Sequence, residues 1–349
     1  MTIRVVLDAM GGDHAPRATV AGGLWALREI SDLHLVLVGP EETIHAELAR
    51  HRPRGLSFSV VHAPQVVGME EHTLAVKTKK DSSLVVGMQE VRAGRAEAFV
   101  SMGNTGAVMA AALFHLGRIP GIDRPALATV YPGAFSPCLL LDVGANTDPK
   151  PDHLVQFAMM GVVYAERVLG WPHPRVGILS NGEEPDKGSW RVREAYRRLQ
   201  ASGLRFVGNV EGKDLARGLA EVVVTDGFTG NVVIKQLEGF VAFLARFLPA
   251  QLTDDPLDRL GLALALPGLL LAAPGLLCLL PSVRRIFRRL DYREYGGAPL
   301  LGVNGVVIIG HGRSDAKAVK NAIHMAVRAV RTGMLDRIRE GLQALAAAS

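Results

Sequence analysis

The chain has 349 residues, of which 48% are hydrophobic and 21% charged, so the length allows a sizeable core and the composition excludes a disordered or low-complexity protein. Its formal net charge of +5 and isoelectric point of about 9.3 favour acidic partners: phosphate compounds, anionic lipid or an acidic carrier protein. Nucleic acid is not expected, because aromatic residues make up only 5% and neither zinc-finger spacing nor an RNP-type motif occurs.

Short runs rich in Val, Ile and Leu alternate with longer stretches of helical periodicity, which predicts an α/β fold with parallel strands and crossover helices. Strands are predicted at residues 3–8, 33–38, 57–61, 98–101, 139–143, 175–179, 222–225 and 306–309. Helices follow most of them and include residues 106–116, 153–169, 190–200, 229–247 and 315–345. The length fits one large domain or two coupled lobes, and we take residues 1–349 as a single α/β domain.

The start of the chain and its cysteines indicate a compartment. The first strand begins at once, without the basic start, apolar stretch and cleavage site of a signal peptide. Cys138 and Cys278 lie far apart in apolar surroundings, so neither a disulfide framework nor a CxxC metal site is expected. Both observations predict a protein of the reducing cytoplasm.

One segment departs from the alternating pattern. Residues 260–280 hold no charged residue, as in a membrane span, yet Pro267, Pro274 and Pro281 argue against a straight one. A broken helical hairpin, inserted at residues 249–291, is the preferred interpretation. In residues 283–290, apolar and Arg side chains fall on opposite helical faces, which is typical of a helix on an anionic membrane surface. A dimer contact, a buried helical pair and a true span are the alternatives to peripheral membrane contact.

Loops rich in glycine and polar residues follow the predicted strands. They occupy residues 8–16, 101–107, 141–148, 180–188 and 225–231, and the sixth is a pair of glycine loops, 302–305 and 310–314, on either side of the last predicted strand. Because open α/β folds bind ligands at the carboxyl ends of their strands, we expect these loops to collect at one edge of the sheet. Backbone N–H groups at the helix starts after these loops are suited to binding an anion. A tight turn or a helix cap explains each loop taken singly, whereas the set of six favours a binding site.

Polar and glycine residues of these loops are the candidate site residues. They are Asp8, Gly11, Gly12, His14, Asn104, Asn146, Lys187, Asp226, Asn231 and His311. Paired glycines let the backbone approach a ligand, Lys187 can reach a phosphate or an oxyanion, and the amide of Asn231 can donate to one. Solvated surface groups are the alternative for Lys187 and His311.

Several catalytic motifs are missing from the sequence. It contains no GxSxG elbow, no HExxH and no paired CxxC, and Lys187 precedes Gly and Ser in an order that fails the Walker template. We therefore expect no metal site and no covalent acyl-enzyme, and direct transfer is favoured.

The loops together resemble those of a known family. The chain is similar to the bacterial phosphate acyltransferase family, PlsX, in the stretches DAMGGDHAP, SMGNTGA, LDVGANTD, SNGEE with a following Lys-Gly, TDGFTGNV, and YGGAPLLGVNG with GHG, in this order. The resemblance covers nearly the whole chain and is weakest at residues 252–281. It implies a three-layer fold like phosphotransacetylase and isocitrate dehydrogenase, a homodimer, and peripheral attachment to the inner face of the cell membrane.

The resemblance also implies an activity: transfer of a fatty acyl group from acyl carrier protein to inorganic phosphate, without a cofactor, giving an acyl phosphate. Lys187 and Asn231 are then expected to act as catalytic residues that orient phosphate or hold the oxyanion, and the other candidates to bind substrate. A docking face for the acidic carrier is expected at Arg191, Arg193, Arg197 and Arg198, with a solvated helix face as the alternative.

Three other functions would share some of these features. A phosphotransacetylase that uses acyl coenzyme A would share the chemistry, but the apolar segment argues against a small soluble substrate. A nicotinamide-dependent decarboxylating dehydrogenase would need clustered aspartates for Mg²⁺ and an arginine clamp, which we cannot assemble. A non-catalytic membrane scaffold would not need helix starts suited to phosphate.

Overall fold

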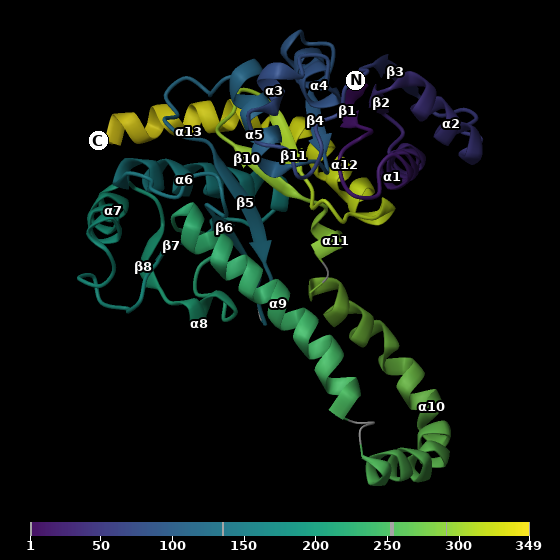
Figure 1. Cartoon of the computed structure of the whole chain (residues 1–349). Coiled ribbons are helices and arrows are strands. Elements are labelled where there is room, and N and C mark those ends of the chain that lie inside the picture. Colours follow the sequence, from purple (N-terminus) through teal and green to yellow (C-terminus); the bar gives the residue numbers. More distant parts are fainter. Residues whose placement is uncertain (1, 135, 252–254, 291, 349) are drawn as a thin grey trace. The chain divides into compact units, whose positions relative to one another are not determined.

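The computed structural model describes residues 2–134, 136–251, 255–290 and 292–348. The chain divides into two compact units, one of Met1–Gly230 with Tyr292–Ser349 and one of Asn231–Asp291. The first unit contains the sheet, and the second is helical (Figure 1). The insertion predicted at residues 249–291 falls within the range of the second unit.

Strands and helices alternate through most of the first unit. Its strands are β1 Ile3–Asp8, β2 Leu33–Gly39, β3 Phe58–His62, β4 Ala98–Ser101, β5 Ala126–Tyr131, β6 Cys138–Leu141, β7 Val176–Leu179, β8 Phe206–Val210, β9 Val222–Val224, β10 Ala298–Leu301 and β11 Val306–Ile309. Its helices are α1 Arg17–Glu29, α2 Glu41–His51, α3 Ala75–Thr78, α4 Ser83–Arg92, α5 Thr105–His115, α6 Pro151–Tyr164 with a π-helical continuation at Ala165–Leu169, α7 Trp190–Ala201, α8 Gly212–Leu215, α11 Tyr292–Tyr295, α12 Ala316–Arg331 and α13 Met334–Ala348. Helix α9 (Gly227–Gln251) begins in the first unit and continues in the second, which also holds α10 (Pro256–Leu290).

The described strands form one sheet in the order β3-β2-β1-β4-β11-β10-β5-β6-β9-β7-β8. β3, β2, β1, β4 and β11 are parallel to one another, and so are β6, β9, β7 and β8. The pairs β11–β10, β10–β5 and β5–β6 are antiparallel. The predicted α/β fold with a mostly parallel sheet is confirmed.

The two parallel sets of strands run in opposite directions, because three antiparallel pairings separate them. Their carboxyl ends therefore lie at opposite edges of the sheet. The prediction that all six polar loops meet at one edge is wrong for this reason. The loops instead form two groups, one after β1, β4 and β11 and one after β6, β7 and β9. Residues 302–305, which join β10 to β11, lie at the edge of the sheet opposite residues 310–314.

Helices cover both faces of the sheet, which gives three layers. A β-carbon on Gly23 of α1 would lie 2.6 Å from the side chain of Leu35 and 3.1 Å from that of Leu7. A β-carbon on Gly87 of α4 would lie 3.0 Å from the side chain of Val6. Consecutive residues of a strand point to opposite faces, so α1 and α4 pack on opposite faces of β1. The helix-helix pairs α1–α12, α4–α5 and α6–α13 extend these layers.

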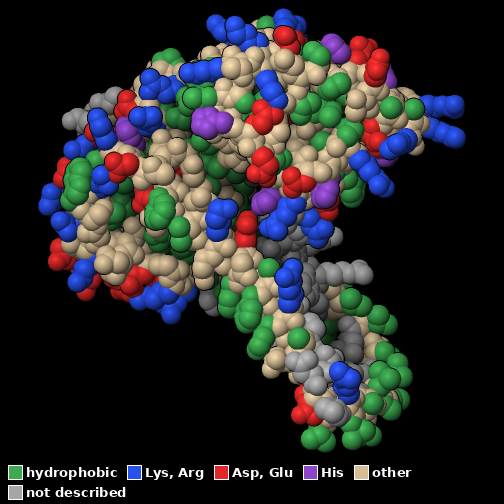
Figure 2. Space-filling model, viewed as in Figure 1, with side chains coloured by type: hydrophobic (Ala, Val, Ile, Leu, Met, Phe, Trp, Pro, Cys, Tyr) green, Lys and Arg blue, Asp and Glu red, His purple; other side chains and the backbone are tan. Residues whose placement is uncertain are grey.

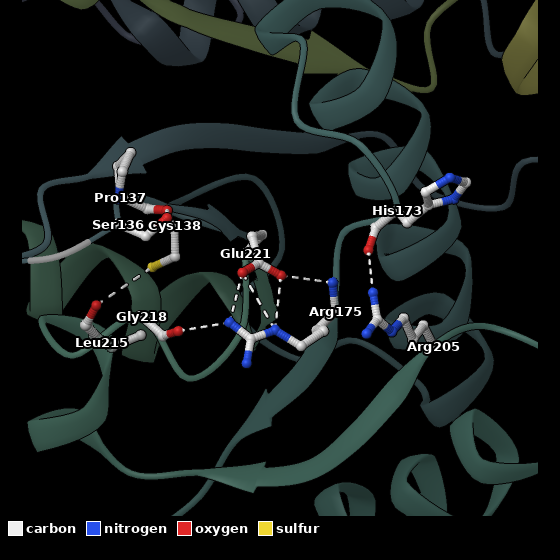
Figure 3. A network of polar contacts seen from close by, with 9 residues as sticks. All are labelled: Ser136, Pro137, Cys138, His173, Arg175, Arg205, Leu215, Gly218 and Glu221. Carbon is white, nitrogen blue, oxygen red and sulfur yellow. Dashed lines mark hydrogen bonds and ion pairs between the residues drawn. The ribbon is translucent and has the colours of Figure 1, made fainter.

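Both halves of the sheet have the same ion pair at the starts of two strands. Arg4 binds Glu97, which precedes β4, through its backbone N–H (2.6 Å) and its guanidinium (2.5 Å), and donates to the carbonyl of Gly94 (2.9 Å). Arg175, which precedes β7, binds Glu221 before β9 at 2.7 and 2.6 Å and donates to the carbonyl of Gly218 at 2.8 Å (Figure 3). Each pair joins two neighbouring parallel strands.

The carboxyl-terminal region is divided at Gly333, where a single helix over residues 315–345 was predicted. Gly333 has a φ of 62°, a left-handed conformation that ends a helix, and it separates α12 from α13. The periodicity hides this break, because the apolar pattern continues on both sides of the glycine.

The second unit contains a long helix in place of the predicted break within residues 260–280. α10 runs from Pro256 to Leu290 with Pro267, Pro274 and Pro281 inside it, and it follows a curved path in Figure 1. The hairpin of this unit is therefore formed by α9 and α10, and the prediction of a break inside the segment is wrong.

The described leucines of α10 are largely exposed, for example Leu264 at 73% and Leu271 at 84%, and Figure 2 shows this apolar surface. Among the described residues, no helix is both long and apolar enough to cross a membrane. The structure describes only the backbone of residues 283–290, so the prediction that their basic and apolar side chains form two faces lies outside what is described.

Candidate active site

The first group of loops is organised by Asp8, which ends β1 and is 1% exposed. Its carboxylate accepts hydrogen bonds from the Ser101 hydroxyl (2.7 Å) and the Met10 N–H (3.1 Å). Burial raises the pKa of Asp8, and the hydrogen bond from Ser101 offsets part of that rise. A carboxylate this deeply buried holds the loop in place. It does not fit the substrate contact that we predicted for Asp8.

Gly11 and Gly12 let three loops approach one another. A β-carbon on Gly11 would lie 2.6 Å from the Asp8 carboxylate and 2.8 Å from the N–H of Gly103. Gly12 has a φ of 96°, which favours glycine, and the next residue donates its N–H to the carbonyl of Gly312 at 2.8 Å. The loops after β1, β4 and β11 therefore meet at this point.

Asn104 caps helix α5. Its side-chain oxygen accepts from the N–H of Ala107 (3.0 Å), and its amide nitrogen donates to the carbonyls of Met69 (2.8 Å) and Glu71 (3.1 Å). A side-chain amide has two hydrogens, so no donor is left for phosphate. The helix cap given as the alternative for this loop is therefore present, and the predicted part of Asn104 in substrate binding stays a prediction. The anion donors that this loop offers are backbone N–H groups at the start of α5.

His14 and His311 extend the first group toward solvent. Both side chains are exposed, and they come from the loops after β1 and β11. His14 lines a hollow of about 330 Å³ with Arg17 and Asp315. The structure thus brings Asp8, Gly11, Gly12, Asn104, His14 and His311 to the ends of three adjacent parallel strands.

The second group of loops is organised by Asp142, which directly follows β6 and is 0% exposed. Its carboxylate accepts from the backbone N–H groups of Leu127, Gly144, Ala145 and Asn146 at 2.6–3.1 Å. Burial raises the pKa of Asp142, and these hydrogen bonds offset part of the rise. Asp142 was not among our site candidates, although an acid between an apolar strand and a glycine marks such a position.

Asn146 belongs to this same network. Its amide nitrogen donates to Asp142 (2.8 Å) and to the carbonyl of Pro125 (2.7 Å), so both hydrogens are used. The side chain therefore holds the loop, and the predicted part of Asn146 in substrate binding stays a prediction. The carbonyl of Asn146 accepts from the N–H of Gly227 at 2.7 Å, and this bond joins the loops after β6 and β9.

Asp226 caps the start of α9. One carboxylate oxygen accepts from the Thr229 N–H and the other from the Thr229 hydroxyl, each at 2.8 Å. Gly230 packs against the backbone carbonyl of Asp142, which leaves no room for a β-carbon. Asn231, the next residue of α9, is exposed and is the first residue of the second unit.

Lys187 lies in the loop after β7 and is exposed. Within the described part of the chain its ammonium group forms no ion pair. Its backbone N–H donates to the carbonyl of Glu184 (3.1 Å), and the buried Asn209 of β8 donates to the same carbonyl (2.5 Å). Asn209 was missed because it comes from a different strand, and no local pattern links it to this loop.

Cys138 is unsuited to nucleophilic attack. It lies in β6 at 0% exposure, with its sulfur 3.9 Å from the carbonyl of Leu215 (Figure 3). Burial, with a smaller contribution from Glu221, raises the pKa of the thiol to about 12. A thiolate is therefore scarce near neutral pH, which agrees with the direct transfer favoured by the sequence.

Comparisons with known proteins agree with this architecture. The profile of the family described as "Fatty acid synthesis protein" matches residues 3–337. The "Phosphate acyltransferase" of Pelotomaculum thermopropionicum is 48% identical over 344 residues, covering 98% of this chain and 96% of that protein. The "Phosphate acyltransferase" of Geobacter sulfurreducens is 45% identical over 342 residues, covering 98% and 94%.

Solved structures show the same fold at low identity. A phosphotransacetylase from Streptococcus pyogenes superposes with a TM-score of 0.59 at 15% identity, covering 94% of this chain and 93% of that one. A branched-chain phosphotransacylase from Enterococcus faecalis gives a TM-score of 0.58 at 17% identity, covering 94% and 99%. The predicted phosphotransacetylase-like fold is thereby confirmed. With the full-length similarity to its relatives, these findings show that the chain belongs to the phosphate acyltransferase family and is an acyltransferase.

Proposed function

We propose that this enzyme transfers a fatty acyl group from acyl carrier protein to inorganic phosphate and releases an acyl phosphate for phospholipid synthesis. The observation that carries the proposal is the near full-length similarity to proteins named phosphate acyltransferase. The net charge of +5 supports an acidic carrier and an anionic acceptor.

In the proposed reaction a phosphate oxygen attacks the thioester carbonyl carbon directly. A tetrahedral oxyanion forms, the carbon–sulfur bond breaks, and the carrier thiolate leaves and takes up a proton from solvent. Phosphate is already a nucleophile near neutral pH, so the enzyme chiefly positions it and stabilises the oxyanion. No cofactor or metal takes part in this proposal.

Lys187 and Asn231 are the proposed catalytic residues, because an ammonium group and a side-chain amide can each donate to an oxyanion. The exposure of both side chains supports this assignment. Backbone N–H groups of the glycine loops complete the proposed phosphate cradle. The proposed substrate-binding set is otherwise the one predicted, with Asp8, Asn104 and Asn146 acting by holding their loops: Asp8, Gly11, Gly12, His14, Asn104, Asn146, Asp226 and His311.

The proposal is tested with purified protein, acyl carrier protein charged with a fatty acyl group, and inorganic phosphate. Free carrier thiol and acyl phosphate should appear in equal amounts, the latter separated from the thioester substrate and identified by mass spectrometry. Thiol release that does not depend on phosphate would reject the proposal. Acyl coenzyme A in place of the acyl carrier tests the alternative donor.

We further propose a cytoplasmic homodimer that contacts the inner face of the cell membrane through its second unit. The exposed leucines of α10 support this contact, because large apolar surfaces mark interaction sites. Flotation with anionic vesicles should be lost in a Leu264→Glu, Leu271→Glu variant. It should persist in Leu219→Glu, which alters an exposed leucine of the first unit. Full flotation of the double variant would contradict membrane contact by this surface.

A further inference from the structure

Three hollows of the first unit meet around the amino end of α6. Their volumes are about 580, 550 and 610 Å³. Asp152 lines all three, Lys150 lines the first two, and Arg198 lines the first and the third. The shared residues show that the three hollows are neighbours, and we call the surface that they form together the α6 groove.

The α6 groove is predominantly basic. Its basic lining residues are Arg118, Arg124, Lys150, Arg193, Arg197 and Arg198, and its acidic ones are Asp123, Asp152 and Glu194. The excess of positive charge favours an acidic partner. The three carboxylates, placed among the bases, favour a partner that carries charges of both signs over a uniformly anionic one.

Much of this basic charge is available to a partner. Among the described residues, the side chains of Lys150 and Arg124 form no ion pair. Arg197 and Arg198 both bind the carboxylate of Glu194, at 3.0 and 2.9 Å, and Arg198 also forms an ion pair with Asp152; these side chains are partly exposed. Such exposed pairs contribute little to folding, so their side chains can be recruited by a partner.

An exposed aromatic side chain adds an apolar contact to the groove. Trp190, the first residue of α7, lines the groove and is 59% exposed, and the guanidinium of Arg191 lies 5.3 Å from the centre of its ring. Tryptophan and arginine are the residue types that most often dominate binding at protein interfaces.

The α6 groove borders the second group of loops. Lys150 follows the loop that Asp142 organises, and α7 begins three residues after Lys187. Arg191 binds Asp148 at 2.6 Å, which ties the start of α7 to the loop after β6. A protein seated in the groove would therefore lie beside the loop that carries Lys187.

We infer that the α6 groove is the docking surface for the acidic carrier protein that delivers the acyl thioester. This inference rests on the proposed function and adds the place where the carrier binds. The basic charge and the exposed tryptophan suit an acidic protein partner. The neighbouring Lys187 loop is where such a carrier would have to present its thioester. An anionic membrane suits the groove less, because the surface is concave and includes three carboxylates.

The test is a charge-reversed variant, Arg124→Glu with Arg197→Glu, compared with the unmodified enzyme. Both residues line the groove, and neither contacts the Lys187 loop in any described hydrogen bond or ion pair. Fluorescence anisotropy with labelled carrier lacking an acyl group measures docking without catalysis. The Kd and the carrier KM should rise at least about tenfold at low salt, with kcat within twofold, because reversed charges act mainly on encounter. The ratio of the carrier KM to the KM for acyl-pantetheine, which lacks the protein surface, should rise equally.

Arg54→Glu, Arg28→Glu is the matched control, with the same change in net charge. Arg54 lies just before β3, at the opposite end of the sheet from β8, and Arg28 lies on α1. If the carrier Kd of the charge-reversed groove variant equals that of this control, the inference is wrong. That holds even if the groove variant binds anionic vesicles less well, because the inference names the carrier as the partner. The double variant Arg124→Ala, Arg197→Ala should give a carrier Kd between those of the unmodified enzyme and the charge-reversed variant. If the charge-reversed variant unfolds at a lower urea concentration than the unmodified enzyme, this alanine variant is used in its place. Tight docking with no acyl phosphate formed would instead reject the proposed function alone.

Discussion

In the first half of the sheet Arg4 binds Glu97 just before β4, and in the second half Arg175 binds Glu221 just before β9. The carbonyl acceptors, Gly94 and Gly218, have φ values of 70° and 72°. With the edge strand β3 left out, the strand order counted inward from both ends places β2 with β8, β1 with β7, β4 with β9, β11 with β6, and β10 with β5. The two halves therefore share one backbone plan and run in opposite directions.

The shared plan is also visible in the sequence on either side of β4 and β9. Gly94, Ala96, Glu97, Ser101, Gly103, Thr105 and Gly106 match Gly218, Ala220, Glu221, Thr225, Gly227, Thr229 and Gly230, in the same spacing. Both stretches run from a turn through a buried strand to the start of a helix. Equal spacing of glycine, acid and hydroxyl residues thus specifies the same local structure twice.

The two halves differ at positions within and beyond this shared pattern. In the first half, Met102, Ala107 and Ala111 are buried beneath the loop and along α5. In the second half the corresponding residues are Asp226, Asn231 and Lys235, of which the last two are exposed on α9. Burial of α5 therefore favours small apolar residues, while exposure of α9 permits polar residues, among them the proposed catalytic residue Asn231.

The largest expected effect tests whether the second half carries the chemistry. Lys187→Ala should lower kcat/KM for acyl-phosphate formation by roughly 100-fold to 1000-fold, because it removes a cationic donor to the oxyanion. The urea midpoint should not change, since the side chain is exposed. Lys80→Ala, which removes another exposed lysine, is the control. A folded Lys187→Ala enzyme with full activity would contradict the assignment.

The next prediction compares the two buried acids. Asp142→Ala should lower the free energy of unfolding by about 4 kcal/mol and Asp8→Ala by about 2 kcal/mol, because more donors lose their acceptor at Asp142. Asp142 accepts from Leu127, residues 144–146 and the Asn146 amide, whereas Asp8 accepts from Met10 and Ser101. Urea unfolding measures both values, and equal losses would break the ranking.

A smaller effect is expected from the two asparagines. Asn104→Ala and Asn146→Ala should each lower the free energy of unfolding by about 1 to 2 kcal/mol, through loss of a cap or of loop hydrogen bonds. At saturating phosphate, kcat should fall less than about tenfold, since neither side-chain amide has a spare donor. A larger loss of kcat at unchanged stability would restore the direct role in substrate binding.

The smallest effect concerns the paired ion pairs and has a defined pH dependence. Burial raises the pKa of Glu221, but hydrogen bonds and charge from Arg175 outweigh this, so its net pKa is lowered. A lowered pKa in the folded state stabilises the fold above the unfolded pKa, and this stabilisation is lost as pH falls through the folded value. Glu221→Gln should therefore cost about 1 kcal/mol at pH 7 and progressively less below about pH 4.5.

Glu97→Gln provides the matched variant in the first half of the sheet. If the two ion pairs are equivalent, the two substitutions should cost similar amounts at pH 7, and the double variant should show their sum. Urea unfolding at pH 7, 5, 4 and 3 measures these values. A cost of Glu221→Gln that grows as pH falls would contradict the sign of the pKa shift.

Much of the fold and the location of the loops could be predicted from the sequence. An apolar run followed by an acid and glycine, as at Asp8 and Asp142, marks a strand end whatever its neighbours are. The one-edge arrangement failed because β5 and β10 were not predicted as strands, and these are the two antiparallel strands at the centre of the sheet. Both lead directly into another strand, β6 or β11, and so lack the sequence of strand, polar loop and helix by which the other strands were predicted.

The roles of the asparagines could not be predicted for a different reason. Asn104 is held by Met69 and Glu71, and Asn146 by Pro125, all of them more than a helix away in the chain. Whether a side-chain amide hydrogen is available to a ligand depends on whether such distant carbonyls already accept it. A residue type that suits an oxyanion therefore identifies a candidate loop, while the fold decides whether side chain or backbone makes the contact.

The strand order has a consequence for how the protein is made. β10 and β11, which come last along the chain, are inserted between β4 and β5 at the centre of the sheet. Until the ribosome has released residues 298–309, two half-sheets exist whose inner edges, β4 and β5, have unpaired N–H and carbonyl groups. Unpaired strand edges invite association between nascent chains. The sheet is therefore completed only when β10 and β11 insert between its two halves. A polypeptide truncated before β10 would keep both unpaired strand edges and would be prone to aggregation and to binding by chaperones.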